Sequence, residues 1–134
     1  MIGMGPWVPH HDAPIGHDVP MTPELAKRQV DLDLRMIAVT RLYMHDINIA
    51  ATTALEALDP KGREKGILAG ANVMMPNATD IKYRPDYLLY DNKPCMTESI
   101  EEGRRHLDER FAAIGERIAW DTRGDPPCTL KPRR

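Results

Sequence analysis

Three short apolar segments, separated by two helix-like stretches, constrain this chain more than any other feature. They are residues 2–8, 46–53 and 71–75, and their length suits strands that are buried on both faces. A strand, a helix and a second strand in succession favour a right-handed crossover between parallel strands. The pattern therefore predicts an α/β fold with about three parallel strands, crossover helices and a C-terminal helix.

The first crossover helix has a clear start. Thr22 offers an N-cap oxygen and Pro23 suits the first helical position, where its missing N–H is harmless. We expect the helix to end near Met44 or His45. Its main apolar stripe is predicted at Leu25, Leu32, Met36, Val39 and Tyr43, widened by Leu34, Ile37, Ala38 and Leu42.

Two more helices are indicated further along the chain. Asp59 and Pro60 repeat the N-cap pattern and predict a helix that ends at Gly70. Ser99 and Glu102 form a capping pair for a last helix, which we expect to reach about residue 118. Residues 9–22 and 77–96 are predicted to be irregular. We divide the chain into a portion at 1–118 and a flexible tail at 119–134.

Three parallel strands do not close a barrel, because closure takes about eight strands and roughly 200 residues. The prediction is therefore a partial (β/α)8 TIM barrel. Its open edge lies at residues 1–8, where unpaired backbone groups need to be covered. We expect either a missing N-terminal half of the barrel or a second copy of the chain to cover it.

Composition argues against several classes of partner. Charged residues make up 28% of the chain and are of both signs, with a net charge of −2, so we expect no nucleic-acid binding. The longest apolar run, residues 34–39, contains Arg35 and is followed by Thr40 and Arg41, so no membrane span is predicted. The first residues lack a signal peptide pattern, which favours a cytoplasmic location.

Five motifs in order resemble one known family. They are residues 5–10 (GPWVPH), 48–55 (NIAATTAL), 59–64 (DPKGRE), 69–77 (AGANVMMPN) and 87–95 (YLLYDNKPC). Together they resemble the C-terminal third of the FeFe-hydrogenase maturases of HydE type, which are radical-SAM enzymes close to biotin synthase. The resemblance spans about residues 1–118. It implies the last three βα units of a (β/α)8 barrel, with the extension associated with biotin and thiamine synthesis proteins.

The same resemblance implies two cofactors for the complete enzyme, S-adenosylmethionine and a 4Fe-4S cluster on a CxxxCxxC motif. This sequence has only two cysteines, Cys95 and Cys128, which lie 33 positions apart. We therefore expect neither cofactor on this chain alone, and we expect it to be inactive alone, although its family is one of enzymes.

Six site residues follow from the resemblance, and none of them is assigned as catalytic. Thr52 and Thr53 match threonines that face an anion or carboxylate in the substrate pocket. Ile15 matches a cavity-facing position. Met75, Leu89 and Tyr90 would lie beside the adenine of the cofactor or the substrate. Without the resemblance, the threonines are strand-end or capping residues, and the methionine and tyrosine are more often core.

A group of histidines needs a separate interpretation. His10, His11 and His17 lie with Asp12 and Asp18 within nine residues, which is enough in principle for zinc or nickel. Loop histidines without cysteine partners are more often local hydrogen-bonding groups, so no metal site is predicted.

Charged residues between 101 and 110 are expected on the solvent-exposed side of the last helix: Glu101, Glu102, Arg104, Arg105, Asp108, Glu109 and Arg110.

The leading hypothesis is the C-terminal part of a HydE-like maturase, separated from its cluster-bearing half by truncation, frameshift or choice of start codon. It would form one wall of a cavity in which a small sulfur- or iron-containing precursor of the hydrogenase cofactor reacts. One alternative is a stand-alone partial-barrel homodimer that binds a small anionic ligand or a protein partner. Another is a fragment of a biotin-synthase-like radical-SAM enzyme.

Overall fold

A parallel pair of short strands lies at the centre of the computed structural model, which describes residues 1–130. Strand β1 (Ile2–Gly3) pairs with β2 (Ile49–Ala50), in the register Ile2 to Ile49 and Gly3 to Ala50. A single parallel bridge joins Ala50 to Val73. The three predicted segments therefore lie side by side and parallel, but a partial barrel is not shown. The chain is a mixed helical structure with a small two-stranded parallel sheet.

The strands are much shorter than predicted, and the third segment forms only the bridge. Proline explains part of this difference, because Pro6 and Pro9 have no N–H to donate to a ladder and Pro76 stops the third segment. The remaining elements are α1 (Pro14–Asp18), α2 (Pro23–Tyr43), α3 (Thr53–Leu58), α4 (Gly62–Leu68), the 3-10 segment η1 (Ile81–Tyr87), α5 (Ile100–Ala112) and η2 (Pro127–Leu130).

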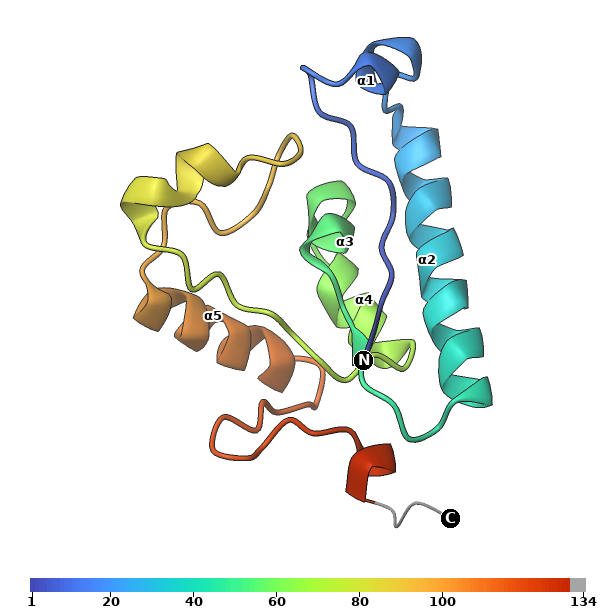
Figure 1. Cartoon of the computed structure of the whole chain (residues 1–134), viewed down its shortest axis with the longest axis vertical. Helices are drawn as coiled ribbons and strands as arrows, with labels where there is room; N and C mark the ends of the chain where they lie inside the picture. Colours follow the sequence, from blue (N-terminus) through green and yellow to red (C-terminus); the bar gives the residue numbers. More distant parts are fainter. Residues whose placement is uncertain (131–134) are drawn as a thin grey trace.

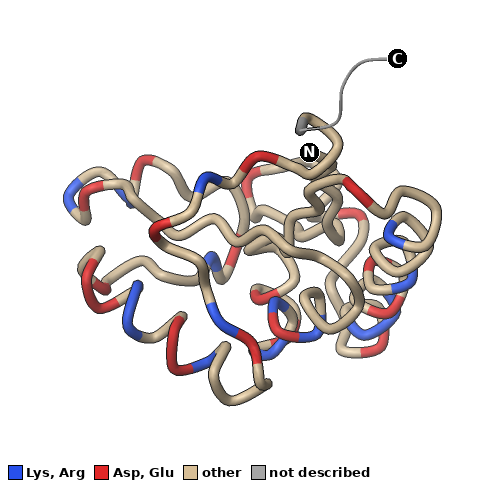
Figure 2. Tube along the Cα trace, turned by 90° about the horizontal axis from the view of Figure 1, so that it is seen from below, with Lys and Arg blue, Asp and Glu red and all other residues tan. Residues whose placement is uncertain are grey.

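The helices gather on one side of the molecule. Figure 1 shows β1 in front of α3 and α4, α2 along one flank and α5 along the other. Figure 2 shows the helical coils along one side, with acidic and basic residues interleaved and no large region of a single sign.

The predicted helix starts are confirmed at two of the three positions. The Thr22 side chain accepts a hydrogen bond from the backbone N of Leu25 at 3.2 Å, and α2 ends at Tyr43. At α5, the Ser99 side chain accepts from Glu102 N at 3.1 Å, while the Glu102 carboxylate accepts from Ser99 N at 2.8 Å. These two bonds are the capping box that the sequence indicated.

The helix start predicted at Asp59 and Pro60 is wrong. Asp59 is the C-cap of α3, and α4 begins only at Gly62. The Asp59 carboxylate instead accepts from the N–H of Lys61 at 2.9 Å, which shapes the turn between the two helices. Gly70 does terminate this region, at a φ of +121° that favours glycine.

Two smaller differences concern the irregular segments and the last helix. The loop at 9–22 contains the short helix α1, and the segment at 77–96 contains η1. Helix α5 ends at Ala112, six residues before the predicted end at Ile118, and Gly115 with a φ of +79° follows it. Cys128 N donates to Asp46 O at 3.1 Å, so residues after 119 contact the start of the second segment.

The main apolar stripe predicted for α2 is wrong, because the opposite face is buried, whereas Leu34 and Ile37 from the predicted widening of the stripe do meet the core. Val30, Asp33 and Ile37 are the buried residues of this helix. The predicted stripe residues Leu32, Met36, Val39 and Tyr43 are 54%, 48%, 65% and 88% exposed. The helix has apolar side chains on two faces, and only one of them meets the core of this chain.

One apolar core joins α2, the strand segments and α3. Its buried members are Val30, Ile37, Ile49, Ala51, Leu55 and Ala71. Burial of these side chains supplies most of the free energy that orders the first 75 residues. Among the described residues no helix is long and apolar enough to cross a membrane.

Candidate functional site

Two of the predicted site residues meet beyond the carboxyl end of β2. Thr53 is the first residue of α3, and its Oγ1 lies 2.7 Å from the Tyr90 hydroxyl oxygen in a part-buried hydrogen bond. Tyr90 comes from a segment 37 positions later in the chain. In parallel α/β folds this end of the strands is where functional side chains gather.

Thr52 occupies the N-cap position of α3 but does not cap the helix with its side chain. Its Oγ1 is buried and has no hydrogen-bond partner within the described part of the chain. Gly5 passes close by, since a Cβ placed there would lie 2.7 Å from that oxygen. Burying a hydroxyl without a hydrogen-bond partner costs free energy of folding. The capping interpretation therefore does not account for Thr52.

The other three predicted residues are not brought into a packed core. Met75, Leu89 and Ile15 are 49%, 74% and 56% exposed, and Ile15 lies on α1. The interpretation of Met75 as an ordinary core residue therefore does not hold. Their roles beside a cofactor or substrate remain predictions.

Comparison with curated proteins gives a clear relative. The chain is 43% identical over 98 residues to the FeFe hydrogenase maturase subunit HydE of Thermotoga maritima. The chain is a partial relative of HydE. The match covers 73% of the chain and 26% of HydE, so the chain spans about a quarter of that protein's length. No protein-family model matches the chain.

The likeness to HydE confirms the resemblance predicted from the five motifs. The rest of HydE has no counterpart in this chain, so activity, substrate and partners of the whole protein come to this chain only as proposals.

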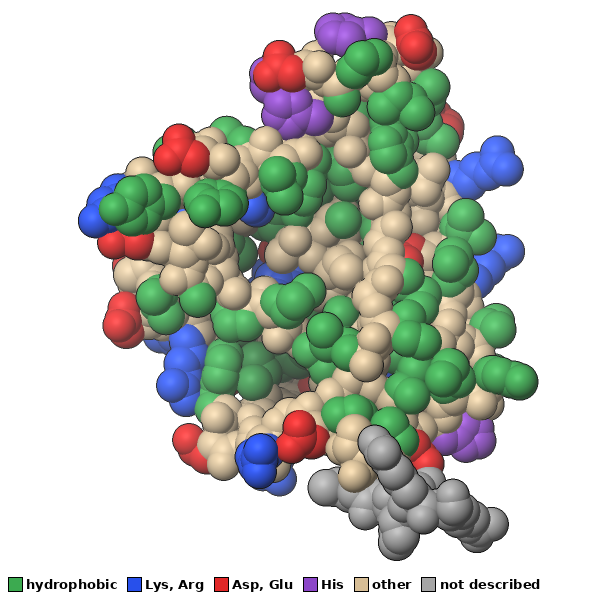
Figure 3. Space-filling model, viewed as in Figure 1, with side chains coloured by type: hydrophobic (Ala, Val, Ile, Leu, Met, Phe, Trp, Pro, Cys, Tyr) green, Lys and Arg blue, Asp and Glu red, His purple; other side chains and the backbone are tan. Residues whose placement is uncertain are grey.

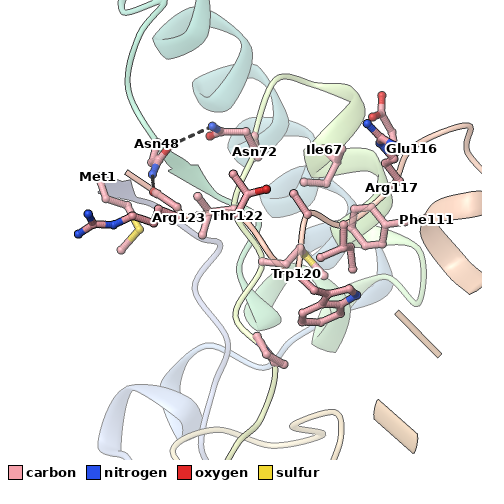
Figure 4. A pocket seen from close by; sticks show the side chains of 17 residues that line it. Met1, Asn48, Ile67, Asn72, Phe111, Glu116, Arg117, Trp120, Thr122 and Arg123 are labelled. Carbon is pink, nitrogen blue, oxygen red and sulfur yellow. Dashed lines mark hydrogen bonds between the residues drawn. The ribbon is translucent and has the colours of Figure 1, made fainter. Parts of the chain in front are cut away.

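One hollow of the molecule is lined by none of the six predicted site residues. It has a volume of about 570 Å³ and is lined by residues that include Asn48, Asn72, Phe111 and Trp120. Figure 4 shows Asn48 and Asn72 near the start of β2, joined by the hydrogen bond from Asn72 Nδ2 to Asn48 Oδ1, with Phe111 and Trp120 on the other side of the hollow. This is the amino end of the strands, where in such folds residues usually serve stability.

A second hollow of about 370 Å³ lies between residues 8–21 and the segment after Tyr90. Its lining includes His10, His11, His17 and Asp91. His11 Nδ1 lies 2.9 Å from Asp91 Oδ1. The hydrogen bond to Asp91 raises the pKa of His11, with Asp12 adding to it, and lowers the pKa of Asp91 in return.

Sequence reasoning missed the arginines that hold the HydE-like segment in place. Arg63 is 1% exposed and donates to Glu56 Oε2 and to the carbonyl of Met75, both at 3.1 Å. It thereby fixes the end of the third strand segment. Nothing in the motif around residue 63 distinguishes this arginine from a solvated one, so no sequence signal was available.

Arg84 has a similar role and is 2% exposed. Its guanidinium donates to four backbone carbonyls, those of Thr79, Cys95 and Glu98 at 2.7–2.8 Å and that of Asn77 at 3.4 Å. These bonds tie together the irregular segment that ends in the HydE-like motif at 87–95. The position of Tyr90 therefore depends on a residue outside the motif.

Proposed function

We propose that this chain forms one wall of the cofactor and substrate cavity of a HydE-like radical-SAM maturase. The observation that carries the proposal is the 2.7 Å hydrogen bond between Thr53 and Tyr90. It joins two motifs, both matched to the HydE family from sequence alone, at the carboxyl end of the parallel segments. That end is the mouth of the barrel in the complete fold, so the chain would be part of a (β/α)8 barrel.

In this proposal the two threonines bind the anionic group of the substrate. The spare, buried hydroxyl of Thr52 can donate one hydrogen bond and accept others. The exposed side chains of Met75 and Leu89 offer apolar surface to the adenine of S-adenosylmethionine. Ile15 lies at the rim in the same proposal and has the least support.

The residues of this chain do not fit the 4Fe-4S cluster of the family. Three thiolates are needed, and the sequence has two cysteines. Of these, Cys95 is partly buried and Cys128 is exposed, and both are free. Burial raises the pKa of the Cys95 thiol, with Glu56 and Glu98 adding to it, which disfavours the thiolate. We propose that the chain is not catalytic alone and that the cluster belongs to another portion of the enzyme.

The proposed partner is the N-terminal barrel portion that carries the cluster. Two surfaces support it: the side of β1 that faces away from β2, and the second apolar face of α2 formed by Leu32, Met36, Val39 and Tyr43. Figure 3 shows hydrophobic and uncharged atoms across the face on which β1 lies, with charged side chains mainly at its rim. A preceding strand and helix would cover the edge and this α2 face together. Free cysteines agree with a cytoplasmic location.

The test is a chimera in which residues 2–118 replace the matching region of Thermotoga maritima HydE. After cluster reconstitution, we expect it to bind S-adenosylmethionine and to release 5′-deoxyadenosine. Thr52→Val in the chimera should weaken substrate binding about tenfold, the value of one or two hydrogen bonds. Thr40→Val, on α2, is the matched control. A folded chimera with full iron content that cleaves no S-adenosylmethionine would overturn the proposal.

The second candidate is a homodimer that binds a small anionic ligand or a protein partner. The same open β1 edge and exposed α2 face favour it, because two copies can cover each other's surfaces. Light scattering on the purified 134-residue chain separates the candidates. A stable dimer that melts cooperatively supports the homodimer, whereas a monomer that binds the cluster-bearing portion of HydE supports the maturase.

A further inference from the structure

Three ligand groups converge in the loop before α1. His10, His11 and Asp12 each present a nitrogen or oxygen atom, and these atoms all lie within 4.8 Å of one another. His11 Nε2 is 3.5 Å from Asp12 Oδ2, and His10 Nδ1 is 4.0 Å from the same oxygen. Figure 3 shows the histidine side chains gathered at the end of the molecule where α1 lies.

These separations are close to those of a bound zinc ion. Tetrahedral ligands at about 2.0–2.1 Å from zinc are roughly 3.3–3.5 Å apart. The His11 and Asp12 atoms already match this spacing, whereas the 4.0 Å between His10 and Asp12 has to shorten when a metal binds. The rings of His10 and His11 are stacked, with centroids 4.4 Å apart and planes inclined by 21°.

Asp91 adds the feature that the sequence did not reveal. Its Oδ1 lies 2.9 Å from His11 Nδ1, so the carboxylate holds the proton on Nδ1. The lone pair of neutral His11 is then on Nε2, the nitrogen that faces Asp12. A carboxylate behind a histidine is the usual arrangement at metal sites, because it orients the ring and makes it a better donor.

His10 has one competing contact. Its Nδ1 accepts a hydrogen bond from the backbone N of Asp12 at 3.1 Å. A metal at Nδ1 replaces this bond, and the amide N–H can turn to water because Asp12 is exposed. His10 itself is more protected, with 22% of its side chain exposed, so its ring loses little freedom on binding.

We propose that His10, His11 and Asp12 form a binding site for a zinc-type divalent transition metal ion, with Asp91 as the positioning residue for His11. Three protein ligands leave one coordination position open. His10 and His11 also line the 370 Å³ hollow, together with His17, Met21 and Asn92. The proposal rests on this cluster and is independent of the proposed maturase function.

The test is isothermal titration of zinc chloride into the untagged 134-residue chain, with magnesium chloride as the reference ion. We expect one zinc per chain and no magnesium binding, since imidazole favours zinc over magnesium. His11→Ala should abolish the binding. Asp91→Asn should weaken it by about 10- to 100-fold, as expected for a residue that orients a ligand. Zinc should also raise the melting temperature of the native chain and leave that of His11→Ala unchanged.

A matched control is available within the chain. His106 Nδ1 lies 3.0 Å from Glu98 Oε2, so it is also a histidine paired with a carboxylate, but it is not part of the cluster at residues 10–12. His106→Ala should keep the full zinc affinity, and so should Cys128→Ser. The proposal would be overturned if the native chain bound no zinc, or if Asp91→Asn left the zinc affinity unchanged. It would also be overturned if either control lost as much zinc affinity as His11→Ala.

Discussion

The first 75 residues and the segment from 76 to 112 are held in place by different means. The first region is packed around the apolar core of Val30, Ile37, Ile49 and their neighbours. The second has two buried apolar side chains of its own, Leu107 and Phe111. Most of its other anchoring contacts run through arginines.

Helix α5 shows the second mode most clearly. Arg110 donates to both carboxylate oxygens of Glu64, at 2.6 and 2.8 Å, and also to Glu56 and the carbonyl of Pro60. The prediction that Arg110 lies on the wet side of the last helix is therefore wrong. The apolar region should unfold cooperatively, whereas the arginine-held region should respond to single polar substitutions and to pH.

The largest effect is expected in the apolar region. Leu55 is 0% exposed and belongs to the core, so Leu55→Ala should destabilise the chain by about 2–5 kcal/mol. Urea denaturation followed by circular dichroism measures this change. Leu68→Ala, at a side chain that is 64% exposed on α4, should change stability by about 0.5 kcal/mol or less. Similar losses in both variants would contradict the description of this core.

Asp33 is the exception within the apolar region. It is 3% exposed, its Oδ2 has no partner among the described residues, and burial raises its pKa from 3.8 to about 6. A raised carboxyl pKa costs no stability below the unfolded value, and the cost is complete above the folded value.

Asp33→Asn should therefore stabilise the chain by about 2–3 kcal/mol at pH 7.5 and have almost no effect at pH 3.5. Chemical denaturation at the two pH values gives the comparison. Asp31→Asn, at an exposed position on the same helix, is the control and should show no such pH dependence. A destabilised Asp33→Asn at pH 7.5 would mean that the carboxylate has a partner in solution.

In the arginine-held region, Arg110→Met should cost about 2 kcal/mol at neutral pH, less than a fully buried pair because 27% of the arginine side chain is exposed. Burial alone would raise the pKa of Glu64, but the hydrogen bond from Arg110 lowers it below 4.5. The stability that the Glu64–Arg110 pair contributes is therefore present above pH 4.5, and it is lost as pH falls through the folded-state pKa of Glu64.

In Arg110→Met, hydrogen exchange should show reduced protection first in the amides of α5. This difference in protection from the native chain should shrink below about pH 4. Arg105→Met is the matched control, because Arg105 pairs with Glu109 at 4.0 Å while 65% exposed. It should cost less than about 0.5 kcal/mol. A loss confined to the core amides, with α5 unaffected, would refute the assigned role of Arg110.

The smallest effect concerns the hydrogen bond between Thr53 and Tyr90, which is one of several contacts between the two regions. A double-mutant cycle of Thr53→Val and Tyr90→Phe should give a coupling free energy of about 0.5–1.5 kcal/mol. Tyr87→Phe, at a ring that is 55% exposed, should show no coupling to Thr53→Val. Zero coupling between Thr53 and Tyr90 would separate the two motifs and remove the main support for the proposed cavity wall.

Much of the local structure was predictable from short-range patterns. The caps at Thr22 and Ser99 and the stop at Gly70 depend on residues within a few positions, so the sequence specifies them directly. The parallel direction of the three apolar segments also followed, because the intervening helices demand a crossover. The likeness to HydE was carried by motifs, and identity to that protein confirms it.

The wrong predictions concern sequence patterns that are compatible with two different structures. Helix α2 has apolar side chains on two faces, and the sequence does not say which face meets the core. Asp59 followed by Pro60 is compatible with a helix start and with a turn. The chain forms the turn, because α3 ends there. The first outcome depends on neighbours that are distant in sequence, and the second depends on the adjacent helix α3.

By itself, the sequence determined the helix starts at Thr22 and Ser99, the stop at Gly70, the parallel direction of the apolar segments and the relation to HydE, since all of these depend on local chemistry or on motif order. Only the tertiary structure decided which arginines are buried, that Tyr90 reaches Thr53 and that Asp91 stands behind His11. These contacts join residues 37 and 80 positions apart. Their energies depend on burial and distance, which no spacing of residue types along the chain specifies.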